Sequence, residues 1–335
     1  MSFLPVLVAF LVASFSAPLI YRALLRTNSR QTISQHIQEH AHKQGTPTMG
    51  GLIILVGLLA GCLSAVAAAL PQGQETFNGV VNALTPFLII LVGFGLVGFI
   101  DDFVIPRRVA GKRGLSWIPK LLLQLAVPIL ACLSTGVTSW LTIALVTFII
   151  LFFANAYNFS DGLDMLAGGL CVLLALGFAF LSRLPLFGGN FEAHGMVMIM
   201  LVSATLPFLI YNAPPAKVFM GDVGSLPIGG CLGWMFAILL LGNTQASVGS
   251  PTLQWDIVVP LLILSFVMIL ELVPVPIQIL WVKLFKRRAF NFKTPIHHAF
   301  QERGWPEPKI VRLFHLVQLI CVVVSIGIAS RGVNL

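Results

Sequence analysis

Ten long apolar segments joined by short polar connections restrict the folds open to this chain. A helix needs about 20 mostly apolar residues to cross the hydrocarbon layer of a bilayer. The segments, of which the seventh is short and the ninth long, are 3–25, 50–70, 81–100, 118–134, 138–157, 166–183, 196–211, 225–241, 256–284 and 309–329. Only 10% of the residues are charged, against roughly 25% in soluble domains. We therefore predict an all-α polytopic membrane protein with about ten transmembrane helices, built as one domain over residues 1–335.

The charges in the connections predict how the chain is oriented. Three connections are rich in lysine and arginine: 26–49, 101–117 and 285–308. Three others contain neither residue: 71–80, 135–137 and 242–255. By the positive-inside rule the basic connections are cytoplasmic, so both termini are expected on the external side. The same placement accounts for the net charge of +8, and we expect no nucleic acid as a partner.

Three smaller features refine this architecture. No basic residue precedes Arg22, which favours an uncleaved first span over a signal peptide. The five cysteines lie singly in separate apolar segments without a CxxC pair, so no disulfide or zinc site is predicted. Pro274 and Pro276 are expected to break or kink the ninth segment, because proline removes a backbone hydrogen bond.

Five aspartates are predicted to gather at the cytoplasmic face. Two end the third segment, two follow the fifth and one precedes the eighth, in the order Asp101, Asp102, Asp161, Asp164 and Asp222. Acids at a membrane boundary are costly unless they serve a site or have partners. The adjacent carboxylates of the third segment repel each other unless a cation lies between them, so they suit metal binding or general-base catalysis. The alternative for that pair is a solvated helix end beside two arginines.

Two further stretches supply polar groups to the same face. Polar residues recur every three positions from Asn155 to Asp164, which suits recognition of a base or ribose; a helix end with an Asp-Gly turn is the alternative. From Asn212 to Ser225, glycines permit a close approach to phosphate, and Ser225 is expected to cap the next helix. Asp222 lies between two glycines there, and we predict that it binds Mg²⁺.

Histidines occur in two of the basic connections. His297 and His298 suit hydrogen bonding to phosphates or proton transfer, whereas solvated side chains in a basic loop are the equally weighted alternative. His36, His40 and His42 are interpreted as a polar helix face, because histidines at helical i,i+4 spacing arise without function. Taken with the acids, lysines and asparagines, the pattern predicts a cytoplasmic cleft for a diphosphate and a divalent metal.

Five motifs in order resemble the signatures of the phospho-MurNAc-pentapeptide translocases, a branch of the polyprenyl-phosphate N-acylhexosamine-1-phosphate transferases. They are Lys43-Gln-Gly-Thr-Pro-Thr-Met-Gly-Gly51, Asp101-Asp102, Asn158-Phe-Ser-Asp-Gly-Leu-Asp164, Lys217-Val-Phe-Met-Gly-Asp-Val-Gly-Ser225 and Thr294-Pro-Ile-His-His298. Together with the ten-span layout they cover essentially the whole chain. The resemblance implies an enzyme of the bacterial inner membrane, active in peptidoglycan synthesis, that makes lipid I and UMP from UDP-MurNAc-pentapeptide and undecaprenyl phosphate with Mg²⁺.

The resemblance also implies roles for individual residues. Asp222 matches the magnesium ligand, while Asp101 and Asp102 match carboxylates tied to catalysis. Lys120 matches a basic residue near the phosphates. Positions lining the nucleotide-sugar cleft are matched by Lys43, Thr48, Asn158, Asp161, Asp164, Asn212, Phe219 and Gln278.

Three positions depart from the family pattern. Ala299 stands where a third consecutive histidine is usual, Met165 replaces a glycine, and Pro274 lies where serine is common. Because no carboxylate is lost, we expect an active enzyme.

Two mechanisms and two other functions stay open. The lipid phosphate attacks directly, with Asp101 accepting its proton if it arrives protonated, or an aspartate first forms a phospho-enzyme. A sister transferase using UDP-N-acetylglucosamine is one alternative function. A secondary transporter is the other, but the acids lie at one membrane face, and Glu271 is the acid that lies within a span. A homodimer stays open as well.

Overall fold

The computed structural model describes residues 3–27, 45–109, 114–187, 191–242 and 254–331, and within these ranges the regular structure is helical throughout. The α-helices are α1 (Leu4–Arg26), α2 (Gly51–Ala69), α3 (Gln74–Phe99), α4 (Ile105–Arg108), α5 (Trp117–Ser134), α6 (Trp140–Ser160), α7 (Leu166–Leu181), α8 (Glu192–Asn212), α9 (Asp222–Leu241), α10 (Trp255–Leu264), α11 (Phe266–Leu272), α12 (Pro274–Phe285), α13 (Ile296–Glu302) and α14 (Glu307–Arg331). The predicted all-α membrane architecture is confirmed.

Nine stretches of the described residues are long and apolar enough to cross a bilayer. The predicted span 166–183 instead forms α7, whose 16 residues are shorter than the roughly 20 that a perpendicular crossing needs. The third predicted span, 81–100, is longer than expected. It starts at Gln74 and continues through a π-helical segment, Ile100–Val104, into α4.

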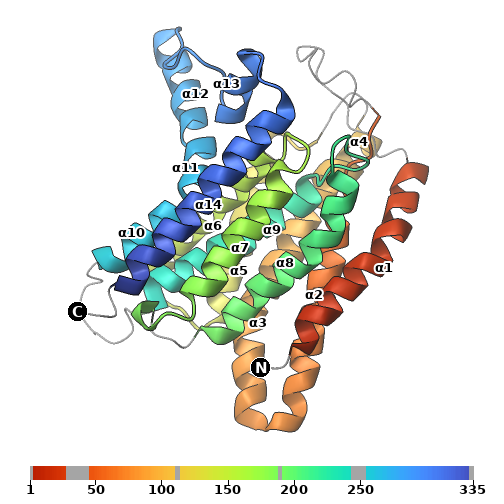
Figure 1. Ribbon diagram of the computed structural model, residues 1–335, viewed down its shortest axis with the longest axis vertical. Coiled ribbons are helices and arrows are strands. Elements are labelled where there is room, and N and C mark those ends of the chain that lie inside the picture. Colours follow the sequence, from red (N-terminus) through yellow and green to blue (C-terminus); the bar gives the residue numbers. More distant parts are fainter. Residues whose placement is uncertain (1–2, 28–44, 110–113, 188–190, 243–253, 332–335) are drawn as a thin grey trace.

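The ninth predicted span is broken, as its prolines indicated. It consists of α10, α11 and α12, with interruptions at Ser265 and Val273. The second interruption immediately precedes Pro274, whose ring cannot donate the backbone hydrogen bond that would continue α11. Consequently α12 leaves the bundle and projects beyond it together with the short helix α13 (Figure 1).

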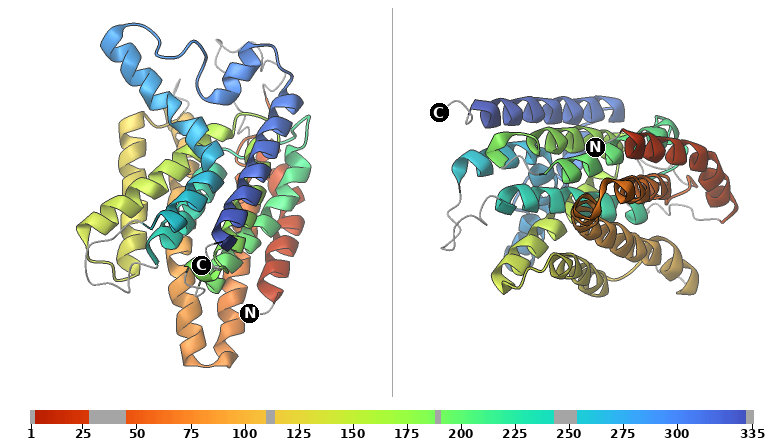
Figure 2. Two further views of the ribbon diagram at one scale, coloured as in Figure 1. Left: turned by 60° about the vertical axis from the view of Figure 1, so that its left-hand side comes forward. Right: turned by 90° about the horizontal axis from the view of Figure 1, so that it is seen from below.

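Helix α9 occupies the centre of the bundle and is buried along almost its whole length (Figure 2). It packs mainly against α6 and α3. Small residues make this possible: a β-carbon on Gly229 would lie 2.7 Å from the Cα of Ala154 in α6. One on Gly51 in α2 would lie 2.2 Å from the Cα of Gly224. Such close backbone approach is how membrane helices pack without a hydrophobic driving force.

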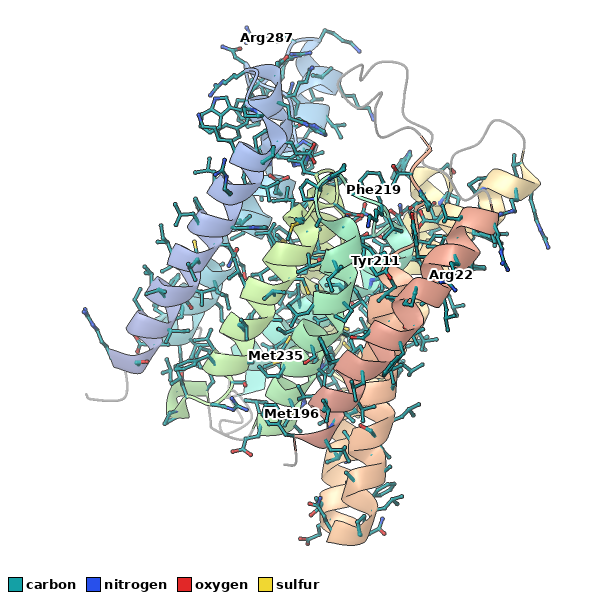
Figure 3. The ribbon with its side chains drawn as sticks, turned by 45° about the vertical axis from the view of Figure 1, so that its right-hand side comes forward. Arg22, Met196, Tyr211, Phe219, Met235 and Arg287 are labelled. Atoms are coloured by element: carbon teal, nitrogen blue, oxygen red, sulfur yellow. The ribbon has the colours of Figure 1, made fainter. Side chains whose placement is uncertain are left out.

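The outer surface of the bundle is apolar, as a bilayer requires. Leu63, Phe148 and Ile210 are among many large hydrophobic side chains that are more than half exposed. Figure 3 shows Phe219 and Arg287 toward one end of the molecule and Met196 toward the other. The start of α1 and the end of α14 both lie toward the end opposite α4, α12 and α13 (Figure 1). Which end is cytoplasmic stays a prediction.

Candidate active site

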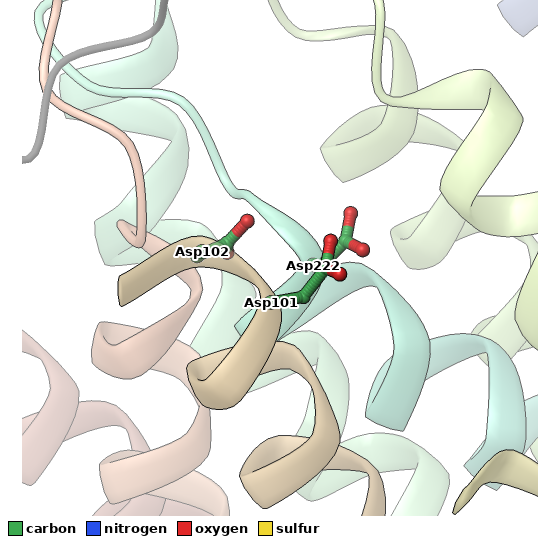
Figure 4. Close-up of side chains that lie close together, drawn as sticks. All are labelled: Asp101, Asp102 and Asp222. Carbon is green, nitrogen blue, oxygen red and sulfur yellow. The ribbon is translucent and has the colours of Figure 1, made fainter. Parts of the chain in front are cut away.

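Three carboxylates from two distant parts of the chain meet near the start of α9. Asp101 and Asp102 lie in the π-helical segment after α3, and Asp222 is the first residue of α9 (Figure 4). All three are half-buried, and each offers a carboxylate oxygen within 4.8 Å of the others. The expectation that the first two end a helix is wrong, because the helix continues through them. Single π-helical turns within α-helices are frequent at functional sites.

Of the residues that the structure describes, Lys120 supplies an ammonium group to this cluster. Lys120 Nζ, in the first turns of α5, is 3.3 Å from Asp101 Oδ2 and also forms a close ion pair with Asp222. The lysine that resemblance placed near the phosphates is therefore joined to the carboxylates. Among the described residues, one positive charge faces three carboxylates, so this part of the cluster carries an excess of negative charge when it is ionised.

Asn158 supplies the neutral partner of Asp222. Its Nδ2 donates to Asp222 Oδ1 at 2.6 Å and to Ser225 Oγ at 2.8 Å. The predicted role of Ser225 as a helix cap is wrong, because Gly221 is the N-cap residue of α9. Ser225 is instead fully buried in the first turn, where it helps to orient the Asn158 amide.

The other two carboxylates also accept backbone hydrogen bonds. Asp102 Oδ2 accepts from Val223 N at 3.1 Å, which ties the π-helical segment to the first turn of α9, where backbone amides lack partners within the helix. Asp101 Oδ1 accepts from Leu115 N at 2.6 Å. These bonds fix the orientation of both side chains, so the cluster is organised by the fold.

The segment around Thr48 runs beside the segment that leads into α9. Phe219 N donates to Pro47 O at 2.9 Å, and Gly50 N donates to Phe219 O at 2.7 Å. A β-carbon on Gly221, whose φ is +73°, would lie 2.6 Å from both Thr48 Oγ1 and Asp102 Oδ2. Thr48 is therefore placed at the cluster. Lys43, His36, His40 and His42 lie outside the described residues.

A second polar network holds the turn after α6 against the same segment. Gly221 N donates to Asp161 Oδ2 at 3.0 Å, and Ala216 N donates to Asp164 Oδ2 at 2.9 Å. Asn212 is buried; it accepts from Met165 N at 2.8 Å and donates to Val218 O at 3.0 Å. The turn alternative for this motif is therefore present, and the two aspartates also hold the turn against the segment that leads to Asp222. Nucleotide recognition stays a prediction.

Met165 shows why a glycine is usual at its position. Its φ of +65° lies in the left-handed region, where a side chain is disfavoured and glycine is not. The hydrogen bond from its amide to Asn212 helps to hold that conformation. Met165 is therefore tolerated at this position, and the hydrogen bonds of Asp161 and Asp164 are present beside it.

The two histidines lie on helix α13, and His297 is not solvated. The His297 side chain is 1% exposed, and its Nδ1 lies 2.7 Å from Oε2 of Glu271, which is completely buried. His298 is half-buried, with Nδ1 2.7 Å from Gln301 Oε1. Ala299 is also buried, so a third imidazole has little space there. The solvated-loop alternative is wrong for His297.

Gln278 is a predicted site residue that makes its hydrogen bonds away from the carboxylates. It lies on α12 and accepts hydrogen bonds from Ala289 N and Phe290 N, at 3.1 and 3.0 Å. Those contacts hold the connection after α12 and do not join it to the carboxylates.

Sequence reasoning missed two acidic residues near the site. Glu307 accepts a hydrogen bond from Asp164 N at 2.5 Å, and Glu271 is the partner of His297. The only signal for Glu271 was its position as an acid within an apolar span, which is costly without a partner. Glu307, in the first turn of α14, carried no distinguishing sequence signal.

The cluster fits a hard divalent cation. Its acidic groups offer only oxygen ligands, which Mg²⁺ prefers, and one or two carboxylates with substrate phosphates usually complete such a site. The negative charge left after pairing with Lys120 favours a further cation. Asp222 is therefore the residue that would hold the metal, with the carboxylates of Asp101 and Asp102 within reach.

Comparisons with known proteins give a consistent result. The model of glycosyl transferase family 4 matches residues 84–240, and the phospho-N-acetylmuramoyl-pentapeptide-transferase signature 1 matches residues 43–55. A phospho-N-acetylmuramoyl-pentapeptide-transferase of Staphylococcus carnosus is 33% identical over 96% of this chain and 97% of its own length. The protein of that name from Staphylococcus saprophyticus is 34% identical over 98% of this chain and 99% of its own length. The one from Desulforudis audaxviator is 33% identical over 97% of this chain and 97% of its own length.

Proposed function

The chain belongs to the phospho-N-acetylmuramoyl-pentapeptide-transferase family, and from this premise we propose how it acts. It transfers phospho-MurNAc-pentapeptide from UDP-MurNAc-pentapeptide to undecaprenyl phosphate, with lipid I and UMP as products. It does so as a multi-pass protein of the bacterial inner membrane, in peptidoglycan synthesis. The observation that carries this proposal is the carboxylate cluster with Lys120 at its centre.

We assign the cluster to the reacting phosphates. Phosphoryl transfer depends mainly on positioning and on stabilising the charge of the phosphate oxygens. Mg²⁺ held by Asp222, with Asp101 and Asp102 beside it, would neutralise charge on the diphosphate and on the leaving UMP. Lys120 contributes a positive charge at the same place, and its contacts with Asp101 and Asp222 position its ammonium.

Two of the remaining residues orient the site, and a third accepts a proton in this scheme. Asn158 orients Asp222, and Asp102 ties α3 to the start of α9 through Val223 N. Asp101 is the proton acceptor for a lipid phosphate that arrives protonated. The supporting geometry is that its Oδ1 is held by Leu115 N while its Oδ2 faces Lys120.

We place the nucleotide on the neighbouring side of the cluster, along the turn Asp161–Asp164 and the segment that ends at Gly221. The support is that hydrogen bonds from Gly221 N and Ala216 N hold these two stretches together next to Asp222. Thr48, in the segment that precedes α2, lies against Gly221 at the end of this stretch.

The test is UMP release by the purified protein with UDP-MurNAc-pentapeptide, undecaprenyl phosphate and Mg²⁺. Release is expected only when all three are present, and it should stop when a chelator is added and resume with excess Mg²⁺. A parallel reaction supplies UDP-N-acetylglucosamine as the donor. Equal or faster release from that donor would assign the chain to the sister transferase activity instead.

A further inference from the structure

A buried carboxylate and a buried imidazole form a pair beside the proposed site. Glu271, in α11, has no exposed surface, and His297, in α13, is 1% exposed. Glu271 Oε2 lies 2.7 Å from His297 Nδ1, and its Oε1 accepts a hydrogen bond from the His297 backbone N at 3.2 Å. Both carboxylate oxygens therefore act on the same histidine, and they hold its ring and its backbone together.

The other ring nitrogen of His297 has no hydrogen-bond partner among the described residues, although it is buried. It faces the turn after α6: a β-carbon on Gly162 would lie 2.9 Å from His297 Nε2. Gly162 stands between Asp161 and Asp164, whose side chains hold the segment leading to Asp222. A buried polar atom without a partner is rare in native proteins, so this nitrogen is available for a group that arrives with the substrates.

The carboxylate determines which nitrogen is available. Because a carboxylate only accepts hydrogen bonds, Nδ1 must carry a proton and donate it to Glu271. Nε2 is then the ring nitrogen left to bond to another group. A carboxylate that fixes a histidine tautomer in this way also stabilises the charged imidazolium.

We infer that Glu271 is a positioning residue for the transfer reaction, holding His297 so that Nε2 is presented beside Gly162 to a phosphate or hydroxyl group of the substrates. The inference rests on the proposed function and goes beyond it, because it gives a role to an acid in the middle of the broken ninth span. Glu271 lies two residues before the interruption at Val273, so the break that sends α12 away from the bundle leaves the carboxylate facing α13.

The experiment compares Glu271→Gln with the parent in the full-length purified protein. Glutamine keeps the size of the side chain but offers one acceptor oxygen and one amide donor, which favours the opposite tautomer of His297. We expect kcat to fall on the order of a hundred-fold, with KM for either substrate changed little. In ¹⁵N-histidine spectra, the His297 signal, identified by its loss in His297→Gln, should show a protonated Nδ1 in the parent and a shift of the proton to Nε2 in Glu271→Gln.

Two comparisons separate positioning from a structural role. In the His297→Gln background, adding Glu271→Gln should lower kcat less than two-fold further, because the residue through which Glu271 acts is already absent. Gln318→Met is the matched control: Gln318 is equally buried and donates to Leu264 O at 2.8 Å, away from the histidine. It should lower thermal stability while leaving kcat unchanged.

The inference is overturned if Glu271→Gln keeps kcat within two-fold of the parent. It is also overturned if Glu271→Gln lowers kcat by the same factor in the His297→Gln background as in the parent. The proposed function is tested separately by the parent. If the parent releases no UMP from these substrates, that function fails, and the ¹⁵N spectra decide the positioning: an unchanged Nδ1 signal in Glu271→Gln would overturn it.

Discussion

Lys120 and Asp222 form an ion pair across 102 positions of sequence, one from the first turns of α5 and the other from the first residue of α9. Each is near the end of an apolar helix, where its charge would be costly without the other. Their pairing brings the fourth and eighth predicted spans into one site. In the proposed mechanism, the metal and the substrate phosphates would therefore meet a cluster that already contains a cation.

Removing the Lys120 ammonium should separate its effect on magnesium binding from its effect on the rate of transfer. In Lys120→Met, the three carboxylates lose their internal partner, so Mg²⁺ should half-saturate the enzyme at a lower concentration than in the parent. The transition state also loses a positive charge, and kcat should fall by about a hundred- to a thousand-fold. Steady-state UMP release across a magnesium titration measures both quantities. A rise in the magnesium requirement would contradict the placement of the lysine within the metal site.

Asp222→Asn should lower magnesium-dependent turnover by about a thousand-fold, while the protein stays folded. The reason is that a neutral amide is a poor ligand and no longer pairs with Lys120. Asp256→Asn is the matched control, because Asp256 is also an acid in the first turn of a membrane helix but is exposed and outside the cluster. Near-parent activity of Asp222→Asn at ordinary magnesium would remove this residue from the site.

The contact between α3 and α9 predicts a steric effect at Gly98. A β-carbon there would lie 2.4 Å from the backbone of Asp222 and Val223, so Gly98→Ala must push the two helices apart. We expect a loss of about 1–3 kcal/mol in stability, with reduced activity because the carboxylates separate. Gly79→Ala, in the same helix with open space around it, should be neutral or stabilising. Thermal unfolding in detergent and UMP release provide the measurements.

The positive-inside rule predicts that the carboxylate cluster faces the cytoplasm. In intact cells, a membrane-impermeant maleimide should label Gln72→Cys, at the exposed turn between α2 and α3, and should not label Arg288→Cys. The five native cysteines are buried and should give little background. Permeabilised cells provide the control, in which both introduced cysteines become reactive. Labelling of position 288 from outside would show that the orientation is opposite to the predicted one.

His298→Ala should have a smaller effect than His297→Ala. His298 is only half-buried and pairs with Gln301 on its own helix, whereas His297 is fixed by Glu271 and directs its free nitrogen at the turn after α6. We expect about thirty- to a thousand-fold loss of rate for His297→Ala and less than ten-fold for His298→Ala. The rates are compared at equal membrane levels, and the reverse order would assign the substrate contact to His298.

The sequence by itself determined the all-α membrane architecture, and it predicted that five aspartates gather at one face of the membrane. Long apolar runs have one stable solution in a bilayer, which is the helix, because every backbone hydrogen bond must be satisfied within the span. The five aspartates were predictable for a related reason: charge at a membrane boundary is too costly to be incidental. Pro274 likewise marked the break in the ninth span, since its ring interrupts the backbone bonding wherever the helix lies.

Only the tertiary structure decided which of these groups touch. The continuation of α3 through a π-helical segment turns Asp101 and Asp102 toward α9, and no local pattern distinguishes that turn from a helix end. The burial of His297 against Glu271 depends on the path of the chain between α11 and α13, which brings together residues 26 positions apart. Helix periodicity and charge are local properties of a chain, whereas pairs such as Lys120 and Asp222 are set by how whole helices pack. The glycines of α9 permit that packing, but the sequence does not say which helices lie against them.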